Sequence, residues 1–177
     1  MPWGQRPRPR RSRVLTVGEA RSPEAPNAYA LALGLLSRRE LTTSELRERL
    51  ERRDLPDQDI ATAIARLASD GTLDDRRAAA AIARTQAAVK GRGRSRVARE
   101  LAARGISGEV AAAALDEVFR ETPEPDLLER ALRRRLRTGH ITDQAHFRRL
   151  YQYLLRQGFP SGAIVSLLKK HSRVDVD

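Results

Sequence analysis

One spacing of apolar residues occurs three times in the chain and limits the folds that it can adopt. Each copy has five apolar positions, separated by 4, 5, 5 and 4 residues. The three copies are Leu46, Leu50, Leu55, Ile60 and Ile64; Val97, Leu101, Ile106, Ala111 and Leu115; and Leu150, Leu154, Phe159, Ile164 and Leu168. Their middle residues lie 51 and then 53 residues apart. A period of this length predicts tandem units that bury their apolar faces against one another.

In each copy the middle apolar residue follows a residue that can end a helix. Gly105 and Gly158 hold this place in the second and third copies, and Asp54 holds it in the first. Glycine adopts the left-handed backbone conformation that ends many helices, and Asp tolerates it better than most residues do. Each copy therefore predicts a helix, a turn whose apolar residue points inward, and a second helix.

Signals for helix ends surround these repeats. Asn27 and Asp74 are suited to cap helices, Thr42–Glu45 has the pattern of a capping box, and Asp70-Gly71 ends a helix. β-Branched residues do not alternate with polar ones over any useful length, so we expect an all-α protein. The predicted helices are 28–37, 44–53, 57–69, 75–89, 94–104, 108–120, 125–137, 143–156 and 161–171.

Taken in threes, these helices predict three modules that follow an N-terminal tail. We expect the modules at residues 27–71, 72–121 and 122–177. Each is too small to bury a large core alone, so stacked modules should form an elongated, curved array. The alternative is a compact globule of three helix-turn-helix units. Residues 1–26 hold five of the nine Pro and six Arg, and we expect them to form a flexible basic tail.

The charge of the chain indicates the kind of partner. The net charge is +11, and Arg supplies all but three of the 34 basic residues. Such a field attracts polyanions, and Arg suits bidentate contacts with phosphates or carboxylates. Aromatic residues make up only 4% of the chain, which argues against a sheet that stacks bases on aromatic rings.

Several classes of protein are excluded by what the sequence lacks. The chain has no Cys, which excludes disulfide scaffolds and thiolate chemistry and fits a reducing compartment. It has no secretory signal and no apolar run of about 18 residues, so we expect a cytoplasmic protein without a membrane contact. Gly91–Arg96 lacks the third glycine of a dinucleotide loop, and His140 and His146 are badly spaced for a metal. We expect no catalytic residue, cofactor or metal, and therefore no enzyme.

Clusters of basic residues are the candidate binding sites. The most concentrated group surrounds a glycine-containing loop and comprises Lys90, Arg92, Arg94, Arg96, Arg99 and Arg104. Further clusters are Arg38-Arg39, Arg52-Arg53, Arg133-Arg134-Arg135 and Arg148-Arg149, although adjacent charges on a helix point apart and each pair alone is more often a solvated face. The functional interpretation is contact with phosphates or with an acidic protein groove, since the loop begins a helix whose amides favour anions. The alternative is a solvated loop whose charge only aids solubility.

The order and spacing of several short segments resemble the RecX family of recombinase regulators. The resemblance covers about residues 28–170 and rests on Ala30-Leu31, Leu35–Glu40, Ser44–Leu46, Leu50, Leu73–Asp75, Ala78-Ala79, Lys90-Gly91, Arg96, Glu100-Leu101, Arg104–Ile106 and Leu154–Phe159. Two positions depart from the family pattern. Ala78 stands where the family usually has Phe, and Gln157 stands where it usually has a second Arg.

The resemblance implies a non-enzymatic regulator of the RecA recombinase. Proteins of this family lie in the groove of the filament that RecA forms on single-stranded DNA. There they limit filament growth, strand exchange, ATP hydrolysis and the SOS coprotease activity. The expected partners are the RecA filament and single-stranded DNA, with duplex DNA as a further candidate, and we expect a monomer. A helix-turn-helix DNA-binding protein and a plain scaffold remain the alternatives.

The resemblance also selects residues within the basic clusters. Its motif residues that would contact RecA or DNA are Arg38, Arg39, Lys90, Arg96, Arg104 and Arg156. Asp74 and Asp75 belong to the same motifs, but we expect them to be structural, because an N-cap and a favourable charge at the helix dipole explain both. Gly105, Gly158 and Phe159 complete the structural set.

Overall fold

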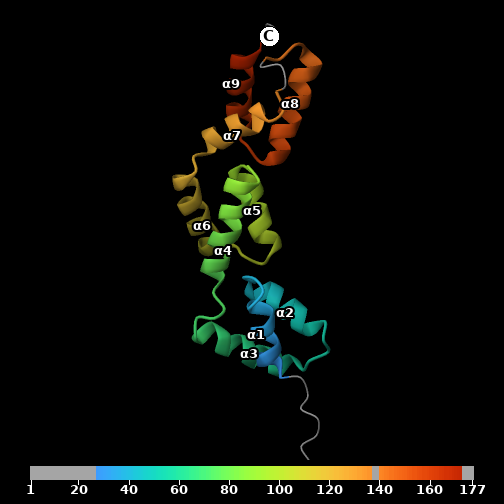
Figure 1. Cartoon of the computed structure of the whole chain (residues 1–177), viewed down its shortest axis with the longest axis vertical. Coiled ribbons are helices and arrows are strands. Elements are labelled where there is room, and N and C mark those ends of the chain that lie inside the picture. The colour runs from blue at the N-terminus through green and yellow to red at the C-terminus, as the bar shows by residue number, and fades with distance from the viewer. Residues whose placement is uncertain (1–26, 137–139, 173–177) are drawn as a thin grey trace, which may run out of the picture.

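The computed structural model describes residues 27–136 and 140–172, so the predicted basic tail lies outside the described residues. Within these ranges the chain forms helices joined by short turns, in an elongated, gently bowed array (Figure 1). The all-α fold and the elongated array of three-helix units are confirmed, and the compact globule is excluded.

The helices pack in three groups of three, which we call modules 1, 2 and 3. Module 1 comprises α1 (Ala28–Leu36), α2 (Thr43–Glu51) and α3 (Asp57–Ser69). Module 2 comprises α4 (Asp75–Arg84), the π-helical turn η1 (Thr85–Val89), α5 (Arg94–Ala103) and α6 (Gly108–Glu121). Module 3 comprises α7 (Glu124–Arg133), α8 (Gln144–Gln157) and α9 (Ser161–His171). The exact domain boundaries, after residues 71 and 121, stay predictions.

The repeated apolar positions form the cores of these modules. Thirteen of the fifteen positions are buried, and only Leu55 and Ala111 are partly exposed. The helix ends also follow the expected chemistry. Asp74 accepts hydrogen bonds from two backbone amides of α4, and the Thr42–Glu45 capping box is formed. Asp54 adopts the expected left-handed conformation, with φ of 53°.

Two helix ends differ from the prediction. The continuous helix expected over residues 75–89 becomes a π-helix at Thr85, where the amide of Lys90 bonds to the carbonyl of Thr85. The buried Gln86 side chain then accepts a hydrogen bond from Arg92. The helix expected to reach residue 137 ends at Arg133, because the amides of the next turn bond back to Leu132 and Leu136 packs against the core.

The three modules are not joined in the same way. Buried side chains of modules 2 and 3 form one continuous hydrophobic cluster, whereas those of module 1 form a separate cluster. The contacts between modules 1 and 2 are largely polar. The backbone amide of Thr43 donates to Asp75 over 2.7 Å, and Arg77 forms an ion pair with Glu40. Modules 2 and 3 therefore share a core, while module 1 is attached through hydrogen bonds and ion pairs.

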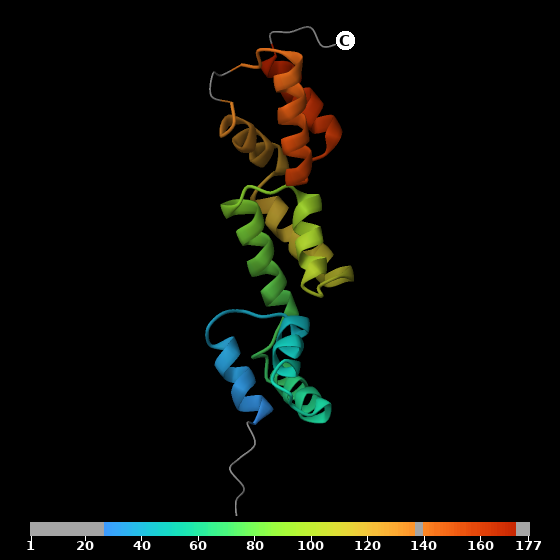
Figure 2. The ribbon, with the colours of Figure 1, turned by 90° about the vertical axis from the view of Figure 1, so that its right-hand side faces the viewer.

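Three helices, one from each module, meet end to end along the molecule. The carboxyl end of α8 lies against the amino end of α5, and the carboxyl end of α5 lies against the amino end of α2 (Figure 2). At the first contact the amide of Gly93 donates to the carbonyl of Gln157 over 2.9 Å. At the second, the hydroxyl of Thr42 donates to the carbonyl of Arg104 over 2.7 Å. Each contact pairs free carbonyls with the positive end of a helix dipole.

Glycine allows the close approach at both contacts. Gly105 and Gly158 have φ of 77° and 95° and end their helices in the left-handed conformation. A Cβ at Gly105 would lie 2.4 Å from Cβ of Ser44, and one at Gly158 would lie 2.5 Å from Cβ of Arg96. The two glycines that precede the repeated apolar residue thus serve the contact between modules as well as the turn.

Candidate functional site

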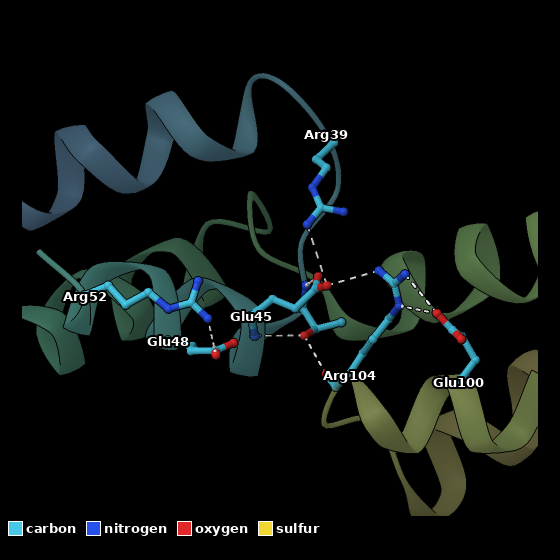
Figure 3. A network of polar contacts seen from close by, with 7 residues as sticks. Arg39, Glu45, Glu48, Arg52, Glu100 and Arg104 are labelled. Atoms are coloured by element: carbon cyan, nitrogen blue, oxygen red, sulfur yellow. Dashed lines mark hydrogen bonds and ion pairs between the residues drawn. The ribbon is translucent and has the colours of Figure 1, made fainter.

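Arg39 and Arg104, two predicted binding residues, meet at the junction of modules 1 and 2 (Figure 3). The guanidinium of Arg104 lies 3.0 Å from Glu45 of α2 and 3.0 Å from Glu100 of its own helix. Arg39 approaches the same Glu45 carboxylate at 3.7 Å. The side chains of Arg104 and Glu45 are only 28% and 17% exposed. The geometry gives Arg104 a structural role between the modules.

The arginines of the glycine-containing loop also have partners within the chain. Arg92 donates to Gln86 and lies 3.6 Å from Glu100. Arg94 forms an ion pair with Asp116 of α6. Arg96 donates to a backbone carbonyl of module 3, that of Arg156, over 2.8 Å. These side chains therefore reach three different parts of the molecule and do not form one basic surface.

Several other predicted binding residues form no ion pair with any described residue. In the part of the chain that the structure describes, no ion pair is formed by Arg38, Lys90, Arg99, Arg148, Arg149 or Arg156. Three of these six lie on α8, at the end of the array that carries the carboxyl terminus (Figure 1). Helix α8 therefore holds the largest group of predicted basic residues that form no ion pair with the described residues.

A surface groove of about 550 Å³ runs beside α8. We call it the α8 groove, and it is lined by Arg135, His146, Arg148, Arg149, Leu150, Gln152, Tyr153 and Arg156. Arg149, Tyr153 and Arg156 are spaced by four and three residues, which places them on one face of the helix. The structure thus brings together Arg148, Arg149 and Arg156, and the described residues that line the groove include no carboxylate.

Tyr153 was not predicted as a binding residue, and Arg135 was named only within the basic cluster Arg133-Arg134-Arg135, without a link to α8. Cζ of Arg135, which follows α7, lies 4.5 Å from the ring centroid of Tyr153. This separation permits a favourable cation–π interaction that holds the guanidinium in place. The spacing of Tyr153 from Arg149 and Arg156 could have indicated its position, whereas no local signal places Arg135 beside α8.

Asp143 caps the amino end of α8 near the groove. Its pKa is lowered, chiefly because the backbone amide of His146 donates to the carboxylate over 2.7 Å. The hydroxyl of Thr142 and the charge of Arg149 lower the pKa further. The carboxylate is thus held in its charged form, and its hydrogen bonds serve the end of the helix.

The described residues contain no group of three or more His, Cys, Asp or Glu side chains that could hold a metal ion. None of the described helices is long and apolar enough to cross a membrane.

The fold and these surfaces define a class of protein: a helical-repeat protein built from tandem three-helix modules. Two family models match its sequence, namely "RecX, first three-helix domain" at residues 28–67 and "RecX, second three-helix domain" at residues 74–115. The chain belongs to the RecX family. The family predicted from the sequence is thereby confirmed.

Individual relatives cover most of the chain. The regulatory protein RecX of Stenotrophomonas maltophilia (strain R551-3) is 33% identical over 166 residues, which are 92% of this chain and 96% of the relative. That of Amycolatopsis mediterranei (strain U-32) is 30% identical over 146 residues, or 82% and 83% of the two chains.

Solved structures agree with the fold. The crystal structure of RecX from Lactobacillus salivarius superimposes with a TM-score of 0.69 at 22% identity, over 81% of this chain and 93% of the other. A second crystal structure of a regulatory protein RecX gives a TM-score of 0.70 at 25% identity, over 81% and 71% of the two chains.

Proposed function

We propose that this protein binds the filament that RecA forms on single-stranded DNA and restrains its activity without catalysing a reaction. The relatives are named regulatory proteins, which supports a regulatory role. The observation that carries the proposal is the end-to-end column of α2, α5 and α8, which gives the molecule an elongated shape that suits an extended partner such as a fibre.

The shape and the charge support a position in the filament groove. An extended, bowed array offers a continuous surface to an extended partner. Its basic residues favour acidic protein surfaces and DNA phosphates. A monomer bound across adjacent RecA protomers would oppose their rearrangement and the addition of further protomers. Strand exchange, ATP hydrolysis and SOS coprotease activity all depend on the filament and would fall together.

The proposed contact residues fall into two groups. Those whose charges are not paired within the described chain are Arg38, Lys90, Arg99, Arg148, Arg149 and Arg156. We propose that they make the main contacts with RecA or DNA. Those that already have partners within the chain are Arg39, Arg92, Arg94, Arg96 and Arg104. Their contribution to binding would require an exchange of partners. The cytoplasm, where RecA acts on DNA, is the proposed compartment.

A titration of RecA ATPase activity tests the proposed function. RecA on circular single-stranded DNA is mixed with increasing amounts of the full chain, and ATP hydrolysis is followed. We expect inhibition when the protein is well below the concentration of RecA, because one bound molecule affects the protomers beyond it. Unchanged ATPase activity at every ratio, together with tight binding to duplex DNA, would instead support a helix-turn-helix DNA-binding protein.

Two charge-reversal variants show whether inhibition of RecA depends on a specific contact of α8 or only on the net charge of the protein. Arg148→Glu with Arg149→Glu alters α8, whereas Arg47→Glu with Arg53→Glu makes the same change of charge on exposed positions of module 1. We expect the α8 variant to lose most of the inhibition and the module 1 variant to keep it. Equal losses would mean that the net charge alone attracts the protein to the filament.

A further inference from the structure

We propose that the α8 groove binds the phosphate backbone of a single-stranded nucleic acid, with an unpaired base stacked beside it. This inference rests on the proposed function, since it assigns the DNA contact of the regulator to one site on module 3. It also places that contact away from the glycine-containing loop, because the arginines of the loop already form ion pairs or hydrogen bonds within the chain.

First, the groove carries positive charge that no ion pair with a described residue balances. The arginines that line the groove are Arg135, Arg148, Arg149 and Arg156. None of them forms an ion pair with a described carboxylate. Asp143, the acidic group whose field acts on Arg149, already accepts hydrogen bonds from His146 and Thr142. The guanidinium groups are thus available to an external anion, and their planar forks match phosphate oxygens.

The second argument concerns the carboxyl end of α8. Free carbonyls at a helix end carry partial negative charge and would weaken an anion site close by. Here module 2 satisfies them. The carbonyls of Arg156, Gln157 and Gly158 accept hydrogen bonds from Arg96, Gly93 and Ser95. The end-to-end contact of α8 with α5 therefore keeps the groove favourable to anions near Arg156.

The third argument distinguishes nucleic acid from an acidic protein segment. The groove contains planar groups as well as charges, namely the ring of Tyr153, the amide of Gln152 and the imidazole of His146. The guanidinium of Arg135 is held on the Tyr153 ring, so it too offers a planar surface. Unpaired bases stack on aromatic and guanidinium planes, whereas the carboxylates of an acidic peptide interact with the charges and do not require planar surfaces. Bases in a duplex are stacked on one another, so the groove suits a single strand.

Fluorescence anisotropy with a labelled oligothymidylate tests this site. The variant carries Arg149→Ala and Arg156→Ala in the full chain. Each phosphate contact on a single strand contributes about −0.7 to the slope of log K against log salt. Loss of two contacts should make the slope shallower by about 1.4 and weaken binding roughly 10- to 30-fold near 0.1 M salt. The control, Arg47→Ala with Arg53→Ala, removes the same charge from module 1 and should leave the slope nearly unchanged.

A second variant and two competitors complete the test. Arg149→Lys with Arg156→Lys keeps the charge but removes the forks, so the slope should be retained while the affinity falls. If circular dichroism shows that the alanine variant does not fold, the lysine variant still tests whether the two guanidinium groups bind phosphate. Unlabelled oligothymidylate should displace the probe far better than duplex DNA or polyglutamate. An unchanged slope in the alanine variant, an equal change in the control, or preferred displacement by duplex or polyglutamate would each overturn the inference.

The results also separate this inference from the proposed function. If the wild-type chain leaves RecA ATPase activity unchanged while the groove variant loses oligothymidylate binding, the regulatory function fails and the groove stands. If the wild-type chain inhibits RecA and the groove variant binds oligothymidylate as well as wild type does, the function stands and the groove assignment fails.

Discussion

The hydroxyl of Thr42 donates a hydrogen bond of 2.7 Å to the backbone carbonyl of Arg104, which lies 62 residues further along the chain. The repeat aligns Thr42 with Gly93 and Arg104 with Gln157. Gly93 donates its amide to the carbonyl of Gln157. The same pair of positions thus joins modules 1 and 2 and modules 2 and 3, once through a side chain and once through the backbone. The repeat governs the contacts between modules as well as the core of each.

Thr42→Val should destabilise the protein by about 2 kcal/mol. The Thr42 side chain is fully buried, and its hydroxyl both accepts from the amide of Glu45 and donates to Arg104. Valine has nearly the same shape but satisfies neither group. The control is Thr62→Val on the exposed face of α3, where a change below about 0.5 kcal/mol is expected. Urea unfolding followed by circular dichroism measures both, and equal effects would contradict this role of Thr42.

A double-mutant cycle on Arg104 and Glu45 should give a coupling of about 1–2 kcal/mol. Both side chains are largely shielded from solvent, so water screens their attraction little, while Arg39 and Glu100 remain as the second partners of Glu45 and Arg104. The exposed pair Arg52 and Glu48, drawn in the same view (Figure 3), is the control and should give about 0–0.5 kcal/mol. A coupling for Arg104 and Glu45 no larger than the control would show that the junction does not depend on this ion pair.

Gly158→Ala should destabilise the protein by about 3 kcal/mol or more, as measured by thermal unfolding. The residue has a positive φ, and the added Cβ would meet the backbone and Cβ of Arg96 at 2.5 Å. Gly162→Ala in α9 is the matched control, because it has an ordinary φ and no atom within 4 Å of its Cβ position. The control should be neutral or slightly stabilising. Similar losses in both variants would contradict the close contact of α8 with α5.

The stability of α8 should depend on pH through Asp143. Its pKa in the folded protein is lowered, mainly by the amide of His146. A carboxylate with a lowered folded pKa contributes stability above its unfolded pKa of about 3.9, and this stability is lost as the pH falls through the folded value. Asp143→Asn keeps a capping side chain but cannot titrate. We expect the difference in melting temperature between wild type and this variant to shrink between about pH 4 and pH 2. A constant difference across that range would contradict the interpretation.

Much of the fold could be predicted from the sequence, because its signals are local. Caps at Asn27 and Asp74 and the turns at Asp54 and Gly71 are encoded within a few residues of the helix ends that they define. The π-helical turn after α4 was missed. Within this turn the buried side chain of Gln86 accepts a hydrogen bond from Arg92, and the spacing of apolar residues does not predict that contact.

The binding surfaces were harder to predict, because charge pairing depends on contacts between distant residues. Arg94 and Arg104 looked like members of one basic loop, but their partners Asp116 and Glu45 lie 22 and 59 residues away in the sequence. Arg149 was predicted from the Arg148-Arg149 cluster and Arg156 from the family resemblance, and both stay predictions as binding residues. Their shared groove depends on the packing of α7 against α8, which brings Arg135 to Tyr153, and no local sequence signal encodes that packing.

Electron cryo-microscopy of RecA–single-stranded DNA filaments mixed with the full chain would reveal whether the protein lies in the filament groove. We expect helical density for the protein along that groove, with each molecule touching more than one RecA protomer and the α8 groove turned toward the DNA. Filaments whose groove stays empty at saturating protein, with the protein bound only to free DNA, would contradict it.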